Sequence, residues 1–135
     1  MNDLVINKVA SLRRCVARAR QEYAANPEGF ATDYTRQDAA LLNVLRACEM
    51  AIDVANHLVR KRKLGVPQSS AEAFEFLADG GIISPAFAQR LTRMVAFRNI
   101  LVHGCTDADM AIIIAVITRE LDELLEFARI ALGRA

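Results

Sequence analysis

The chain has 135 residues, of which 53% are hydrophobic and 24% are charged, a balance that predicts one globular domain over residues 1–135 and excludes wholesale disorder. The formal net charge of +1 argues against a polybasic nucleic-acid coat or an acidic tail. The cysteines Cys15, Cys48 and Cys105 lack metal-ligand spacing, so we expect neither a disulfide scaffold nor a zinc site, and we expect a reducing cytoplasm. Neither a signal peptide nor an apolar run long enough to span a membrane is visible.

Apolar residues recur at alternating steps of three and four along most of the chain, which predicts an all-α fold, an up-and-down bundle of four to five helices. The first two helices are expected over about 3–25 and 35–63. A capping box at Ser69 and Glu72 opens a short helix that reaches about Ala78. Ser84 and Pro85 begin a fourth helix that continues toward His103. Thr106 or Asp107 caps the last helix, which reaches about Gly133.

The last predicted helix is apolar around most of its first half. Residues 112–117 could form a strand by propensity alone, but the apolar stripe runs on without a break into a clearly helical segment. Ile112, Ile113 and Val116 lie off that stripe and need cover on a second side. Either this helix is the central one of the bundle or a partner subunit covers it, and the pattern favours neither.

Arg98 stands out because it projects into the middle of the apolar arc of the fourth helix, which Phe87, Leu91, Met94 and Leu101 form. A guanidinium group at such a position destabilises the folded state by several kcal/mol unless it is paired or reaches water. Two interpretations follow. Arg98 forms a salt bridge with Glu49 or Asp53 of the second helix, or the seam opens onto a functional cleft, and the two are compatible.

His103 follows Arg98 by five residues at the expected end of that helix, where Gly104 permits the chain to unwind. An arginine can bind a phosphate and its developing charge, and a histidine can transfer a proton near neutral pH. The pair therefore suits cleavage of RNA without a metal, with the 2′-hydroxyl group of the RNA as nucleophile. Because this reaction needs both an acid and a base, a two-fold dimer with two Arg98/His103 pairs in one cleft would supply both.

Other candidate groups carry weaker signals. We interpret His57 as a structural or surface histidine, with a role in the site as the alternative. We interpret the basic run Arg60–Lys63 as a solvated helix end that the helix dipole favours, with binding of RNA phosphates as the alternative. Glu49 and Asp53 lie four residues apart, but no histidine or second carboxylate pair completes a ligand set, so we expect no metal and no cofactor.

The segment 97–104, FRNILVHG, resembles the signature of HEPN-domain proteins, specifically the HepT-like family. Gln37-Asp38, the segment 45–53 with Glu49 and Asp53, and Leu64–Ser69 are similar to the same family, so the resemblance covers nearly the whole chain. It implies a homodimeric helical bundle and a metal-independent ribonuclease with Arg98 and His103 as the catalytic pair and Asn99 as a polar neighbour. It also implies a toxin that a cognate minimal nucleotidyltransferase (MNT) antitoxin neutralises.

Cys105 departs from the family pattern, because the family commonly has a tyrosine at this position that the nucleotidyltransferase modifies with AMP. Cysteine offers no phenol, so neutralisation would need steric blocking or modification elsewhere, for example at Thr106. Two hypotheses follow: a dimeric endoribonuclease toxin acting on RNA, or a non-catalytic HEPN module that binds a nucleotidyltransferase or a nucleotide. A pure assembly protein is a third.

Overall fold

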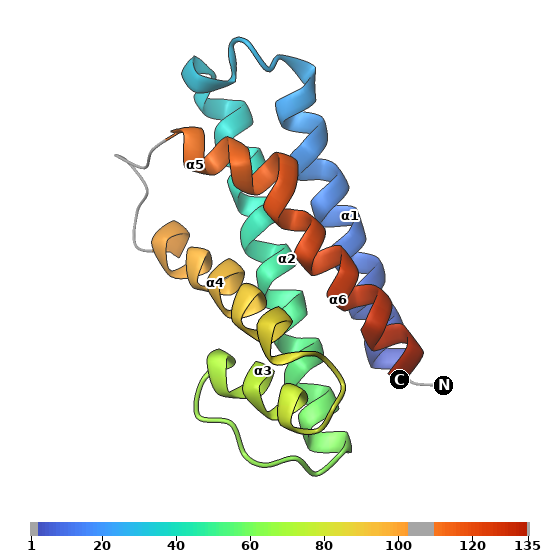
Figure 1. Ribbon diagram of the computed structural model, residues 1–135. Coiled ribbons are helices and arrows are strands. Elements are labelled where there is room, and N and C mark those ends of the chain that lie inside the picture. The colour runs from blue at the N-terminus through green and yellow to red at the C-terminus, as the bar shows by residue number, and fades with distance from the viewer. Residues whose placement is uncertain (1–2, 103–109, 135) are drawn as a thin grey trace.

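Two long antiparallel helices, α1 (Asp3–Ala25) and α2 (Tyr34–Lys61), run side by side through the length of the molecule (Figure 1). The computed structural model describes residues 3–102 and 110–134. The short helix α3 (Ser70–Asp79) packs at the end of α2, and α4 (Pro85–Val102) returns along α2. A last helical segment then packs against α1, α2 and α4. The described residues contain no strand, which confirms the predicted all-α bundle.

The predicted helix starts and ends are close to those observed. Asp33 caps α2 by accepting a hydrogen bond from the backbone N–H of Arg36 at 3.1 Å, and the helix begins at Tyr34, one residue before the expected start. The helix ends at Lys61 instead of residue 63, because Lys63 adopts a left-handed conformation with φ 56°. Ser69 and Ser84 cap α3 and α4 as expected, through bonds from the N–H groups of Glu72 and Phe87.

The last helical segment contains an irregular turn that the sequence did not predict. It consists of α5 (Met110–Ala115), the π-helical turn η2 (Val116–Glu120) and α6 (Leu121–Arg134). A π turn leaves carbonyl groups in need of other donors. Arg20 of α1 donates from Nε to the carbonyl oxygen of Ile117 at 2.9 Å and from Nη2 to Asp122 at 2.8 Å. The predicted caps Thr106 and Asp107 lie outside the described residues.

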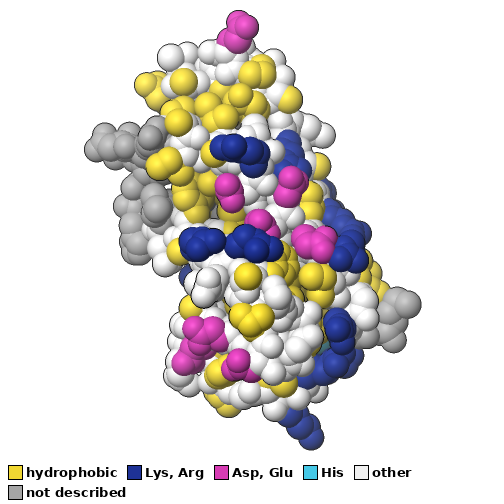
Figure 2. Space-filling model, in the orientation of Figure 1, with side chains coloured by type: hydrophobic (Ala, Val, Ile, Leu, Met, Phe, Trp, Pro, Cys, Tyr) yellow, Lys and Arg dark blue, Asp and Glu magenta, His cyan; other side chains and the backbone are white. Residues whose placement is uncertain are grey.

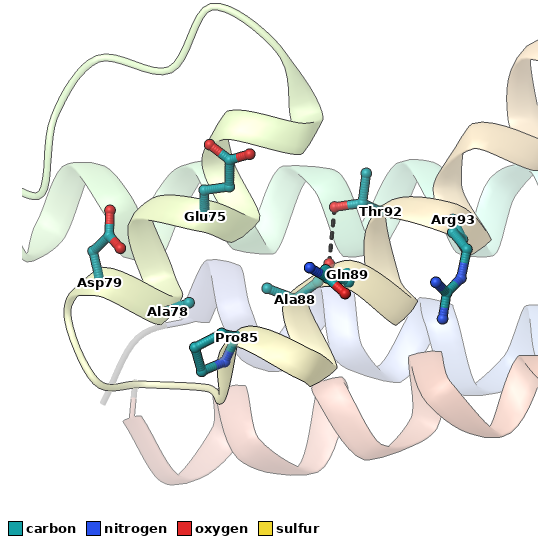
Figure 3. Close-up of a pocket in the computed structure, with 8 residues that line it drawn as sticks. All are labelled: Glu75, Ala78, Asp79, Pro85, Ala88, Gln89, Thr92 and Arg93. Atoms are coloured by element: carbon teal, nitrogen blue, oxygen red, sulfur yellow. Dashed lines mark hydrogen bonds between the residues drawn. The ribbon is translucent and has the colours of Figure 1, made fainter.

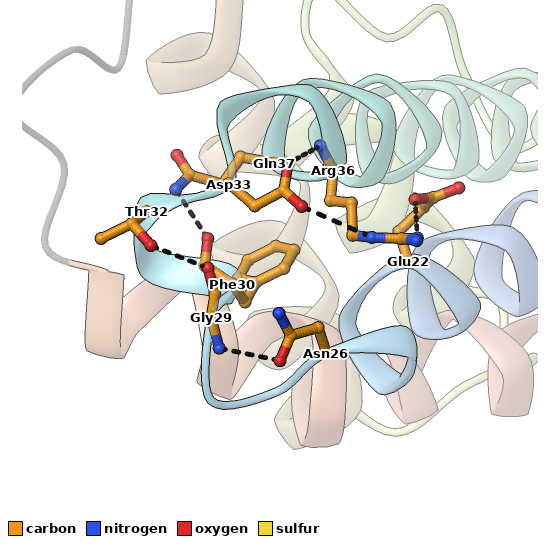
Figure 4. A network of polar contacts seen from close by, with 8 residues as sticks. All are labelled: Glu22, Asn26, Gly29, Phe30, Thr32, Asp33, Arg36 and Gln37. Carbon is orange, nitrogen blue, oxygen red and sulfur yellow. Dashed lines mark hydrogen bonds and ion pairs between the residues drawn. The ribbon is translucent and has the colours of Figure 1, made fainter.

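The connection between α1 and α2 is held by a network of polar contacts around the 3-10 turn η1 (Phe30–Thr32), drawn in Figure 4. Gln37, the one buried polar side chain among the described residues, donates from Nε2 to the carbonyl oxygen of Phe30 at 2.8 Å. Arg36 pairs with Glu22 of α1 at 3.0 Å. These contacts fix how α1 lies along α2.

The apolar core lies between α1, α2, α4 and α6, with Phe74 of α3 stacked edge-to-face on Phe127 of α6 at a centroid distance of 5.6 Å. Of the three off-stripe residues of the last helical segment, Ile113 and Val116 are buried within the chain. Ile112 is 54% exposed. The bundle itself therefore covers two of these side chains, and one is left at the surface. No helix in the described ranges is long and apolar enough to cross a membrane.

Candidate active site

Arg98 lies half-buried near the end of α4, where that helix packs against the middle of α2. One turn before it, the carbonyl oxygen of Met94 accepts a hydrogen bond from the buried thiol of Cys48 on α2, with an Sγ to O distance of 3.8 Å. The packing of α4 on α2 and this hydrogen bond place Arg98 beside α2 at the level of Cys48 and its neighbour Glu49.

The positive charge of Arg98 acts on the buried thiol of Cys48. Burial raises the pKa of the Cys48 thiol to about 12, although the positive charge of Arg98 acts to lower it, and Glu49 adds to the increase. Cys48 is therefore a neutral thiol at physiological pH. A neutral thiol does not neutralise the positive charge of Arg98, which stays available to another group.

Arg98 has no carboxylate partner within residues 3–102 and 110–134. Its Nε atom is buried and lacks a hydrogen-bond acceptor there. Asp53, one of the two partners that the sequence left open, forms a salt bridge with Lys8 of α1 at an Nζ to Oδ2 distance of 3.0 Å. Glu49, the other, is exposed and forms no ion pair with Arg98 in the described part of the chain. A buried donor without an acceptor costs about 1–3 kcal/mol, so its presence points to a ligand or a second chain.

The remaining predicted site residues are placed as follows. Asn99 is exposed on α4 next to Arg98. His103 and Cys105 lie outside the described residues. His57 is half-buried on α2, nine residues after Cys48 and so roughly 13 Å farther along the helix axis, away from Arg98. Burial and the charges of Arg60 and Lys61 lower the pKa of His57.

A groove of about 360 Å³ lies between α4 and the α5–η2 segment, and Phe97, the neighbour of Arg98 in the chain, lines it. Its lining includes Met94 and Phe97 from α4, Ile112 from α5, and the arginines Arg90 and Arg93. In Figure 2 hydrophobic side chains gather on the upper part of the face shown, where α5 and the α1–α2 connection lie. This groove combines apolar walls with guanidinium groups next to the candidate site.

A second pocket, of about 440 Å³, lies between α3 and α4 (Figure 3). Glu75 and Asp79 of α3 face Gln89, Thr92 and Arg93 of α4 across it. Thr92 uses its hydroxyl group to donate to the carbonyl oxygen of Ala88 at 2.8 Å, so it offers no free donor there. None of the residues predicted as catalytic lines this pocket. Among the described residues no cluster of histidine, cysteine and carboxylate side chains could hold a metal ion.

Sequence reasoning identified Arg98 but missed Cys48 as its neighbour. The sequence held one hint, because Cys48 is next to Glu49, a predicted partner of Arg98. Only the packing of α4 on α2, however, brings the thiol of Cys48 to the level of Arg98.

Comparisons with known proteins agree on one family. The family model described as "Ribonuclease HepT-like" matches residues 12–131. The mRNA nuclease HepT of Shewanella oneidensis is 39% identical over 127 residues, which cover 94% of this chain and 95% of that protein.

Two solved structures have the same fold along nearly their whole length. The tri-AMPylated Shewanella oneidensis HEPN toxin in complex with MNT antitoxin has a TM-score of 0.91 and 38% identity, covering 98% of this chain and 99% of that one. A toxin–antitoxin crystal structure with AMP-PNP also has a TM-score of 0.91, with 37% identity and the same coverage. The chain therefore belongs to the HepT-like ribonuclease family.

Proposed function

We propose that this protein is a metal-independent endoribonuclease, the toxin of a HEPN/MNT toxin–antitoxin pair, and that it cleaves RNA with Arg98 and His103 in a cleft of a homodimer. The observation that carries the proposal is the buried Nε atom of Arg98, which lacks an acceptor among the described residues and lies beside a neutral thiol. A phosphodiester provides the acceptors and the negative charge that this group lacks.

Each group then has a chemical task. Arg98 binds the scissile phosphate and stabilises the charge that develops on its oxygens. A histidine takes the proton from the 2′-hydroxyl group of the RNA, whose oxygen attacks the adjacent phosphorus atom. The bond from phosphorus to the 5′ oxygen breaks, and a second histidine protonates that oxygen. The products are a 2′,3′-cyclic phosphate and a 5′-hydroxyl group.

The reaction needs two histidines, one as base and one as acid. Each chain offers one candidate, His103, so two chains would supply both, which supports a homodimer. The exposed Ile112 and the groove between α4 and the α5–η2 segment provide an apolar surface that a second copy could cover. Asn99 and Glu49, exposed near Arg98, would orient the RNA. We place the protein in the cytoplasm, where mRNA and a cognate MNT antitoxin would meet it.

Cleavage of a defined RNA in EDTA tests the proposal. Wild-type protein, Arg98→Ala and His103→Ala are compared with Arg13→Ala, in which an exposed arginine of α1 is removed. We expect cleavage by the wild type and by Arg13→Ala, and a loss of at least 100-fold in each of the other two. Equal cleavage by all four would refute the assignment of the site. Sedimentation of a monomer at micromolar concentration would refute the composite dimer site.

The second candidate is a non-catalytic module that binds a nucleotidyltransferase. The observation that favours it is Cys105, which replaces the tyrosine expected from the family pattern. Absence of cleavage by the folded wild type, with retained binding of the cognate antitoxin, would favour this candidate.

A further inference from the structure

A groove of about 470 Å³ lies between α1 and α2, on a different side of the molecule's central helix from Arg98. Its lining is made by the α1 residues Ser11, Arg14, Cys15 and Arg18 and by the α2 residues Ala39, Leu42, Asn43, Arg46 and Met50. The apolar part includes the buried Cys15 and the half-buried Met50, and the exposed guanidinium groups of three arginines stand around it.

The three arginines line the groove around Cys15. Burial raises the pKa of the Cys15 thiol, while the charges of Arg46, Arg14 and Arg18 act together to lower it, which places all three near the same sulfur atom. In the described ranges none of them forms an ion pair, although Lys8, Arg20 and Arg36 on the same two helices do. Arg14 donates only to the hydroxyl group of Ser11, at 3.2 Å.

The groove gathers positive charge that no carboxylate pairs in the described ranges. Three like charges around one groove repel one another, and a chain with a net charge of only +1 has enough carboxylates to pair them elsewhere. The groove instead concentrates positive charge, together with the hydroxyl group of Ser11 and the amide of Asn43. Arginine, serine and asparagine side chains are among the groups that bind nucleic-acid phosphates.

The groove lies at the same level of α2 as the candidate active site. Arg46 lines the groove, and Cys48, which neighbours Arg98, follows it by two residues, about 3 Å along the helix axis. The groove and Arg98 are thus separated by roughly the width of one helix, about 10–12 Å. Because α2 itself fills the direct line between them, an RNA strand that contacts both regions passes around the helix, and its phosphates in the groove are several nucleotides from the scissile bond.

We propose that the α1–α2 groove binds the backbone of the RNA strand that is cleaved at Arg98, with Arg14, Arg18 and Arg46 contacting phosphates several nucleotides from the scissile bond. This inference rests on the proposed ribonuclease function and adds a second contact region to it. An acidic protein segment is the other class of polyanion. The groove favours RNA because its exposed apolar area is small, with Leu42 at 45% exposure as its one exposed large hydrophobic side chain among the described residues.

The test measures binding separately from cleavage. A fluorescent single-stranded RNA with 2′-O-methyl groups throughout lacks the nucleophile, so its affinity is measured by polarisation without turnover. The groove variant carries Arg14→Gln, Arg18→Gln and Arg46→Gln. The matched control carries Arg13→Gln, Arg60→Gln and Lys61→Gln, which remove the same charge from exposed positions outside the groove. Far-UV circular dichroism and thermal melting show whether each variant is folded.

For the groove variant we expect affinity to fall on the order of tenfold or more at 50 mM salt, and the slope of log K against log salt to become shallower by about 2, since each single-strand phosphate contact contributes about 0.7. The control should keep a slope within about 0.5 of the wild type. An equal change in both variants would overturn the groove assignment, as would no change in either.

Two further outcomes separate this inference from the proposed function. If the wild type cleaves RNA and the groove variant binds and cleaves as well as the wild type, the groove inference is wrong and the ribonuclease function stands. If the groove variant loses binding of the cognate antitoxin but not of RNA, the groove binds protein and the inference is also overturned. Absence of both RNA binding and cleavage in the folded wild type would refute the two proposals together.

Discussion

Replacing Arg98 by leucine separates the stability of the fold from its chemistry. The guanidinium group is half-buried in an apolar seam next to Met94, and its Nε atom is buried without an acceptor in the described part of the chain. Leucine extends the apolar arc of α4 and removes that donor. If Arg98 is a residue kept for function, its loss should stabilise the protein while it abolishes cleavage.

The expected gain in the free energy of unfolding follows from the burial of the Nε donor of Arg98. A buried donor without a partner costs about 1–3 kcal/mol, and half-burial of Arg98 places the gain near the lower end, about 1 kcal/mol. The entropy of unfolding is about 2.1 cal/mol/K per residue, so for 135 residues a gain of about 1 kcal/mol raises the melting temperature by about 3–4 °C.

Differential scanning calorimetry and the RNA cleavage assay are run at one protein concentration, because association of copies would make the melting temperature depend on concentration. Arg98→Ala serves as a second variant, which removes the charge without adding apolar contacts and should melt within about 2 °C of the wild type. A fall of 8 °C or more in Arg98→Leu, corresponding to about 2 kcal/mol or more, would refute the reasoning and show that Arg98 has a stabilising partner.

Three further predictions concern the fold. Gln37→Leu should lower the free energy of unfolding by about 0.5–1.5 kcal/mol in urea titrations, because the carbonyl oxygen of Phe30 loses one of its two donors and keeps the backbone N–H of Asp33 at 3.2 Å; an unchanged value would show that this bond contributes nothing. The lowered pKa of His57 means that the unfolded chain binds a proton more readily than the folded chain. The contribution of His57 to the free energy of unfolding should therefore be constant above about pH 6.5 and become unfavourable as the pH falls below it. His57→Gln should lose that part of the pH dependence, and an identical profile would contradict the assignment. Cys48, with a thiol pKa of about 12, should resist iodoacetamide in the native protein at pH 8 and react after unfolding, as mass spectrometry of the peptide would show; rapid native labelling would contradict its burial.

Helix positions could be predicted from the sequence because each depends on local signals. The capping residues Ser69 and Ser84 and the three–four spacing of apolar residues lie within one helix turn of the boundaries they set. The π turn at Val116–Glu120 could not be predicted, because the apolar stripe runs through it unchanged and its stabilising donor, Arg20, comes from a distant part of the chain.

The candidate site could be predicted only in part. The position of Arg98 in an apolar arc is a property of one helix, and the pattern was sufficient to single it out. Its contact with Cys48, the salt bridge of Asp53 with Lys8, and the convergence of three arginines on one groove each depend on the packing of two helices. Such contacts have no signature in the spacing of residues along a single helix.

The chemical ends of the RNA fragments test the central claim most directly. The measurement is mass spectrometry of the products that the wild-type protein releases from a defined RNA in EDTA. The proposed mechanism predicts 2′,3′-cyclic phosphate and 5′-hydroxyl ends, formed by the 2′-hydroxyl group while Arg98 holds the phosphate. Fragments with 3′-hydroxyl and 5′-phosphate ends, or cleavage that requires an added divalent metal, would contradict it.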